Sequence, residues 1–173
     1  MATGSRYSVK FRRVRAGKTD YRARKQMLIS RKPRLVIRKS LKHTSMQLIV
    51  LGKEGDKTLV SANTGDLGKY GYTGPTGNSA AAYLTGLLLG YRAKKNGLAE
   101  AITDIGLYHA TKAARVFAAL KGAVDAGMDI PHNPEIFPSE DKFTGKEIDA
   151  FRNTNISEQF EAVKQKIQGE SGE

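Results

Sequence analysis

The feature that most constrains this chain is the distribution of its charge. Residues 6–42 contain fifteen Lys and Arg residues against a single carboxylate, Asp20, which gives this stretch a net charge of +14. The whole chain carries only +12, so the remaining residues sum to −2. A local excess of this size repels itself in water, and it therefore predicts a polyanionic partner.

The residues between the charges narrow the kind of polyanion. Tyr7, Val9, Phe11 and Val14 alternate with basic residues, and Tyr21 follows. Nine of the fifteen basic residues are Arg, whose planar guanidinium pairs bidentately with phosphate and stacks on bases. Aromatic side chains interleaved with Arg are typical of proteins that bind single-stranded or looped RNA. A solvated basic tail or a localisation signal stays open as an alternative, whereas a membrane surface is disfavoured because no long apolar face accompanies the charge.

We call residues 1–33 the arm, and within it the sequence predicts a short helix over residues 21–29. Thr19 and Asp20 are residue types that favour helix N-termini, and Pro33 is expected to end the helix. The apolar stripe of this helix is thin, with Tyr21 and Leu28 as its main members. We therefore expect the helix to be stable only when it is docked.

Composition sets further bounds. A chain of 173 residues is long enough for one domain with extensions. It contains no Cys, which excludes disulfides, thiolate metal sites and a Cys nucleophile, and which suits a reducing compartment. No apolar run approaches the length of a membrane span. The composition thus predicts a cytoplasmic protein that does not enter a membrane.

The body, residues 34–130, is predicted to be a mixed α/β unit. Residues 35–37, 45–51 and 58–62 indicate three strands with short connections, of which the first is a turn at residues 40–43, and short connections favour an antiparallel meander. Helices are predicted at 79–93 and 113–128, with a strand at 101–108 between them. This helix-strand-helix order requires a crossover, which favours a parallel last strand. One sheet face is expected to pack on helices and the other to remain available.

Residues 131–173 form a predicted helical extension. Pro131, Pro134 and Pro138 mark the break, and Thr144 with Glu147 has the spacing of a capping box. A last helix carries Ile156, Phe160, Val163 and Ile167 on one face. Residues 135–173 hold nine acids and five bases, and charge alone leaves open whether this extension folds back or meets another protein.

The glycine-rich stretch at residues 63–78 superficially suggests a nucleotide site. A Walker A motif requires Lys followed by Ser or Thr after its last glycine, but Gly77 is followed by Asn78 and Ser79. Two interpretations stay open. The stretch is either a flexible connector that ends with Asn78 as a helix cap, or it contacts RNA phosphate through its backbone at the helix N-terminus, aided by Tyr70 and Tyr72.

Catalysis has little support in the sequence. The three His residues are scattered, and Asp104 lies on a predicted strand, as in metal-dependent nucleases, which need several converging carboxylates. Asp56, Asp66 and Asp125 fall in a turn, a loop and a helix, so convergence is not expected. The sequence predicts no catalytic residues, no metal, no cofactor and no small-molecule substrate. A general RNA chaperone and a Mg²⁺-dependent nuclease stay open as alternative functions.

Ordered blocks along the chain resemble one protein family. They are RR (12–13), KTDY (18–21), KPRLV (32–36), RKS (38–40), YG (70–71), PTGN (75–78), AYLTGLL (82–88), DIGL (104–107), VDAG (124–127) and DIPHN (129–133). In this order they resemble the family of large-subunit ribosomal protein eighteen, which binds 5S rRNA, in its archaeal branch. The resemblance extends to about residue 133.

The resemblance implies a three-strand meander followed by helix, strand and helix. It also implies that the partners are 5S rRNA, large-subunit rRNA and neighbouring ribosomal proteins of the central protuberance, and that Asp104 is a structural strand residue. The RNA contacts that it implies are Arg12, Arg13, Lys18, Thr19, Tyr21, Arg34, Arg38, Lys39 and Ser40, together with Tyr70, Thr76 and Asn78. Charge and placement add Lys10, Arg15, Arg22, Arg24, Lys25, Lys42 and His43. We expect the arm to neutralise phosphates while the sheet face and the turn at residues 40–43 recognise RNA shape.

Overall fold

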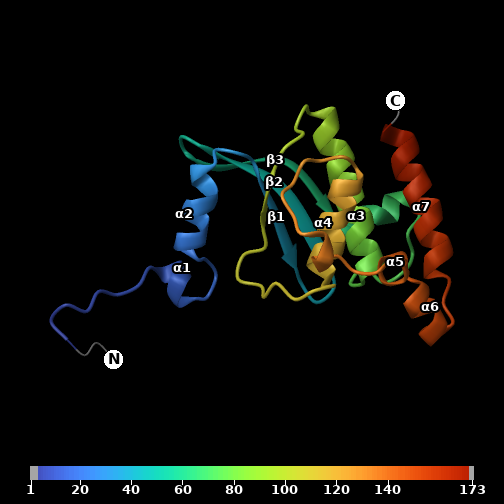
Figure 1. Cartoon of the computed structure of the whole chain (residues 1–173), viewed down its shortest axis with the longest axis horizontal. Coiled ribbons are helices and arrows are strands. Elements are labelled where there is room, and N and C mark those ends of the chain that lie inside the picture. Colours follow the sequence, from blue (N-terminus) through green and yellow to red (C-terminus); the bar gives the residue numbers. More distant parts are fainter. Residues whose placement is uncertain (1–3, 172–173) are drawn as a thin grey trace.

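The computed structural model describes residues 4–171 as a mixed α/β fold with an extended N-terminal arm (Figure 1). The elements in chain order are α1 (Arg12–Arg15), α2 (Tyr21–Ile29), β1 (Arg34–Lys39), β2 (Thr44–Gly52), β3 (Gly55–Asn63), the 3₁₀ helix η1 (Thr64–Tyr70), α3 (Ser79–Lys95), β4 (Ile102–Asp104), α4 (Arg115–Asp125), the 3₁₀ helix η2 (Pro134–Ile136), α5 (Glu140–Thr144), α6 (Lys146–Arg152) and α7 (Ile156–Ser171).

The four strands form one sheet in the order β3-β2-β1-β4. β1, β2 and β3 pair antiparallel, and β4 pairs parallel to β1, with Val36 opposite Asp104. These pairings confirm the predicted meander and the predicted parallel strand after a crossover. Leu35, Ile37, Met46 and Leu48 are fully buried on one face. In β2 the alternation of Met46 and Leu48 with half-buried neighbours marks this as the face that enters the core.

Two helices cover that apolar face. α3 and α4 pack against each other and against the strands, and small residues let their backbones approach closely. A Cβ at Gly86 would lie 1.9 Å from the carbonyl oxygen of Ala119, and one at Gly122 would lie 2.1 Å from the carbonyl oxygen of Tyr83. No side chain fits in either place, so these two glycines set the separation of the helices. The predicted core residues Val116, Phe117 and Leu120 are all buried.

The C-terminal extension folds back on the body. α7 packs along α3, on the side away from the sheet (Figure 1). Its predicted apolar face, Ile156, Phe160, Val163 and Ile167, is at most 2% exposed and belongs to the same hydrophobic core as the sheet. The rings of Tyr83 and Phe143 stack with centroids 4.7 Å apart, which joins α3 to α5. The extension therefore folds back on the body, which charge alone did not decide.

The strand predicted over residues 101–108 is much shorter in the structure. β4 ends at Asp104, whose Oδ1 accepts a hydrogen bond from the backbone N–H of Gly106 at 2.9 Å. Gly106 has φ of +67°, and a Cβ there would meet the guanidinium of Arg38. This local turn takes the chain out of the sheet, and for that reason the prediction beyond Asp104 was wrong.

Two helix boundaries also differ from prediction. The helix predicted from residue 113 begins at Arg115, because Ala113 has φ of +57° and its N–H bonds to the carbonyl oxygen of Ile136. The capping box at Thr144 is absent, since Thr144 lies in the last turn of α5 and its hydroxyl donates to the carbonyl oxygen of Glu140 at 2.8 Å. The Thr-x-x-Glu spacing therefore spans the junction of two short helices.

The glycine-rich stretch is more ordered than a flexible connector. Asn63 and Asp66 form a capping box that starts η1, and Tyr72 is 5% exposed. Asn78 caps α3 as predicted, with its Oδ1 accepting from the N–H of Ala81 at 2.7 Å. Side-chain oxygens of Asn63, Asp66 and Asn78 thus accept hydrogen bonds from backbone N–H groups at the starts of η1 and α3.

Candidate nucleic-acid interface

Within the arm, α2 lies beside the sheet on the side away from α3 and α4, and the segment before α1 extends away from the body (Figure 1). α2 occupies the predicted range and has no buried residue, so packing alone does not hold it. Asp20, the one acid of the arm, accepts hydrogen bonds from the N–H groups of Arg22 at 2.8 Å and Ala23 at 3.3 Å. The carboxylate is therefore used as the helix cap, at the end where it complements the helix dipole.

The basic side chains of the arm project into solvent. Arg13 is braced within the arm, because its Nε donates to the Thr19 hydroxyl at 2.9 Å, and the ring of Tyr21 contacts that of Phe11. The exposed predicted contacts of the arm are Lys10, Arg12, Arg13, Arg15, Lys18, Tyr21, Arg22 and Lys25, with Thr19 half-buried. They form a broad cationic surface whose fixed positive charge suits a chain of phosphates.

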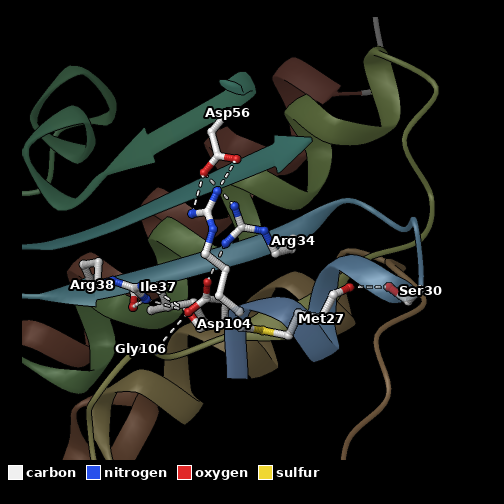
Figure 2. Close-up of polar contacts among 9 residues, drawn as sticks. Met27, Ser30, Arg34, Ile37, Arg38, Asp56, Asp104 and Gly106 are labelled. Carbon is white, nitrogen blue, oxygen red and sulfur yellow. Dashed lines mark hydrogen bonds and ion pairs between the residues drawn. The ribbon is translucent and has the colours of Figure 1, made fainter. Parts of the chain in front are cut away.

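A partly buried ion-pair network connects the arm to three strands (Figure 2). Arg34, on β1, donates from Nη1 to Asp104 Oδ2 and from Nη2 to Asp56 Oδ2, both at 2.8 Å. Arg24, on α2, pairs bidentately with Asp56 at 2.9 and 2.8 Å. Asp56 therefore lies between an arginine of the sheet and an arginine of the arm. Bidentate guanidinium–carboxylate pairs fix orientation as well as distance, so this carboxylate aligns α2 on the sheet.

Arg38 completes the network at the other end of β1. Its Nη2 donates to Asp104 Oδ1 at 2.9 Å, and its Nη1 donates to the carbonyl oxygens of Asp104 and Ile37. Both carboxylate oxygens of Asp104 are thus paired with arginines, which agrees with its expected structural role. Arg38 still exposes 41% of its side chain, and it lines a hollow of about 280 Å³ together with Arg13 and Lys18 of the arm.

The network changes the role that we assign to Arg34. Its side chain is 4% exposed, and both of its terminal nitrogens hold carboxylates. We therefore interpret Arg34 as a positioning residue and do not carry it forward as a direct RNA contact. Arg24 is also engaged, but 31% of its side chain remains exposed.

Electrostatics favours the charged form of Asp56. Partial burial by itself would raise its pKa, but the hydrogen bonds and charges of Arg24 and Arg34 outweigh burial and lower the pKa below its ordinary value. The Asp56 carboxylate consequently remains ionised, and its contacts remain intact, throughout the neutral range.

A second basic surface surrounds the turn at residues 40–43. The N–H of Ser40 donates to the carbonyl oxygen of His43 at 2.7 Å, and the N–H of His43 donates to the Ser40 hydroxyl at 3.0 Å. The Thr76 hydroxyl donates to the carbonyl oxygen of Lys42 at 2.8 Å. Leu41 is 92% exposed at the tip. The turn is rigid, and it presents Leu41 and Lys42 to solvent.

Two residues that sequence reasoning missed support this turn. Arg115 donates to the carbonyl oxygens of Ser40, at 2.6 Å, and Gly77. Tyr108 donates from its hydroxyl to the carbonyl oxygen of Lys39 at 2.6 Å, and the ammonium of Lys39 lies 5.2 Å from its ring centroid. Both contacts join positions about seventy residues apart, for which the sequence has no local signal.

The remaining predicted contacts have structural partners. The Tyr70 hydroxyl donates to Glu170 at 2.6 Å, and Asn78 bonds to the Tyr72 hydroxyl as well as capping α3. His43 lies within 3.2 Å of the Thr64 hydroxyl through Nδ1. These contacts hold Tyr70 against the C-terminal end of α7 and Asn78 at the start of α3.

Other kinds of site find no support in the part of the chain that the structure describes. Within residues 4–171, no group of three or more His, Asp or Glu side chains is arranged to hold a metal ion. Asp56 and Asp104 do approach the same side chain, but the cation between them is Arg34. No helix in this range is long and apolar enough to cross a membrane.

Comparison with known proteins defines the class. The family model of ribosomal large subunit proteins 60S L5 and 50S L18 matches residues 5–101 and 92–133. The chain therefore belongs to this family, whose members are structural components of the large ribosomal subunit rather than enzymes.

Individual relatives extend the likeness over nearly the whole length. The chain is 48% identical to the large ribosomal subunit protein uL18 of Methanococcoides burtonii, over 98% of this chain and 99% of the relative. It is 51% identical to that of Methanoregula boonei, over 96% and 99%, and 47% identical to that of Methanothrix thermoacetophila, over 98% and 100%. The predicted family resemblance is confirmed.

Proposed function

We propose that this chain binds 5S rRNA and attaches it to the large-subunit rRNA in the central protuberance, beside neighbouring ribosomal proteins. Membership of a ribosomal large-subunit family supports rRNA and ribosomal proteins as the partners in general. The choice of 5S rRNA rests on the resemblance of the ordered sequence blocks described above.

The observation that carries the proposal is the construction of the arm. Most of its basic side chains are exposed to solvent, and its single acid, Asp20, caps the N-terminus of α2. Asp56 of the sheet aligns α2 through its bidentate pair with Arg24. A flexible basic tail would have to lose its conformational freedom on binding, whereas this arm is already directed.

The mechanism is a clamp that performs no chemistry. Arm cations neutralise phosphates on one side, and the turn at residues 40–43, braced by Arg115, contacts RNA at the other end of β1. The proposed direct contacts are Lys10, Arg12, Arg13, Arg15, Lys18, Thr19, Tyr21, Arg22, Arg24, Lys25, Arg38, Lys39, Ser40, Lys42 and His43. We assign Tyr70, Thr76 and Asn78 a supporting role, since each is committed to a partner within the chain.

A competition titration tests this proposal. Labelled 5S rRNA is bound to the full chain and displaced by unlabelled 5S rRNA or by structured RNAs of matched size. The proposal predicts that 5S rRNA competes at much lower concentration, and that affinity falls by about 10³–10⁵ between 50 and 200 mM salt if six to ten phosphates are engaged. Equal competition by every RNA would indicate a general RNA chaperone and would refute the proposal.

A further inference from the structure

A large hollow lies between the arm and the loop that follows β4. It has a volume of about 710 Å³, and Val9, Phe11, Val14, Tyr21 and Leu107 supply its apolar walls. Phe11 and Leu107 are 74% and 51% exposed. Large apolar side chains gathered in one open hollow indicate a binding surface, because scattered single exposures are what an unused surface shows.

The two rings in this hollow are arranged to accept a third. Phe11 and Tyr21 make an edge-to-face contact with centroids 5.6 Å apart and an angle of 73° between their planes. Most of the Phe11 side chain remains uncovered, since it is 74% exposed. An open ring face beside a second aromatic ring is a suitable platform for stacking a flat group.

The charged residues around the hollow indicate which planar ligand it would bind. Lys10 and Arg22 also line it, and so does Asp20, the one acid of the arm, whose Oδ1 is engaged as the cap of α2. A ligand that places an aromatic ring on Phe11 and anionic groups beside Lys10 and Arg22 would match the apolar walls and both cations. Nucleotides in a single-stranded or bulged segment have this chemistry, whereas the side chain of a partner protein would leave the two cations without anions.

We propose that this hollow, the base site, receives an unpaired nucleobase of the bound RNA, stacked on Phe11 between Tyr21 and Leu107. This inference rests on the proposed function, and it adds a base-reading element to a surface otherwise described by phosphate contacts. Its volume lies within the range of 300–1,000 Å³ typical of small-ligand sites. The arm thus distinguishes an RNA with an unstacked base from a continuous duplex of equal charge.

Fluorescence provides a direct test because the chain contains no Trp. Phe11→Trp places a single reporter in the base site, and Ile29→Trp places one at the end of α2, where residue 29 is 71% exposed and does not line the hollow. Adding 5S rRNA should strongly quench the emission of Phe11→Trp through stacking and leave that of Ile29→Trp nearly unchanged. Equal quenching of both variants, or of neither, would overturn the base site.

Affinity measurements separate stacking from charge. Phe11→Leu should weaken 5S rRNA binding about 5- to 150-fold, the range for loss of one stacked base, with an unchanged dependence on salt. Phe11→Tyr keeps the ring and should bind like the original chain. If Phe11→Leu and the original chain bind 5S rRNA equally, the base site is refuted while the proposed function stands. If the original chain shows no preference for 5S rRNA, the proposed function itself fails.

Discussion

The arm and the C-terminal extension both contain helices, yet they are held in opposite ways. The arm has no buried residue in α1 or α2 and is attached through two ion pairs, Arg24–Asp56 and Lys32–Glu100. The C-terminal extension is acidic, but α7 is attached by an apolar face whose members are at most 2% exposed. An apolar face that is buried in the core is no longer available to a partner, whereas attachment by ion pairs leaves most of the arm surface exposed for binding. The region with the weaker internal attachment is thus the one that we assign to binding.

Removing the arm should give the largest effect on binding. A chain that starts at Arg34 loses most of the cationic surface but none of the core, since no arm residue is part of the apolar core. We expect its RNA affinity to fall by at least about 10³ at moderate salt while its thermal unfolding remains cooperative. Gel-shift titration and circular dichroism measure both properties, and unchanged binding would remove the arm from the account.

A core substitution in the extension should show the opposite pattern. Phe160 is fully buried and packs near Tyr83 and Phe143. Phe160→Ala should lower the free energy of unfolding by about 3–5 kcal/mol, because it leaves a cavity in the shared core. Urea denaturation measures this loss. RNA affinity under conditions where the variant is folded should stay within about twofold, and a large loss of affinity would show that the extension also binds RNA.

Asp56 tests the connection between the arm and the body. Asp56→Asn removes the charge that holds Arg24, and we expect faster amide hydrogen exchange in α2 with a loss of only about 1 kcal/mol, since these side chains are about 30% exposed. The lowered pKa of Asp56 gives a sign for pH: the contribution is present above the ordinary carboxyl pKa of about 3.9 and is lost as pH falls below it. The loss of α2 protection on acidification should therefore be smaller in Asp56→Asn than in the original chain, where the Asp20 cap and the Asp56 pair are both affected.

Single cations should give the smallest effect and the finest comparison. Arg13→Ala should weaken binding and reduce the slope of log affinity against log salt by about one, as expected for one lost phosphate contact. Lys53→Ala removes an exposed cation from the turn between β2 and β3. Filter binding should show that Lys53→Ala has nearly the same RNA affinity as the original chain. Equal losses from both variants would mean that binding depends on net charge and not on the arm.

Local patterns predicted much of the fold. The helix at residues 21–29, the meander, α3 and the apolar face of α7 follow from caps and from hydrophobic periodicity, and these signals are contained within each segment. The errors occurred where a single residue redirected the backbone, at Gly106 after β4, at Ala113 before α4 and at Gly145 between α5 and α6. Hydrophobic periodicity carries no information about a positive φ at a single residue.

The site was less accessible from the sequence. Charge density located the arm, but Asp56 looked like a turn residue. Only the pairing of β2 with β3 and of β1 with β2 and β4 brings Asp56 and Asp104 to opposite sides of Arg34. The burial of Arg34 and the bracing of the turn by Arg115 depend on contacts across 70 and 75 residues of sequence. Neither contact leaves a pattern in the local sequence, because each forms only when distant segments come together in the fold.

The most direct measurement is a cryo-electron microscopy structure of the large ribosomal subunit that contains this chain. Our account predicts rRNA phosphates within hydrogen-bonding distance of the guanidinium groups of Arg12 and Arg13 and the ammonium of Lys18, along an arm still joined to Asp56 through Arg24. An arm surrounded by solvent, or covered only by protein, would contradict it.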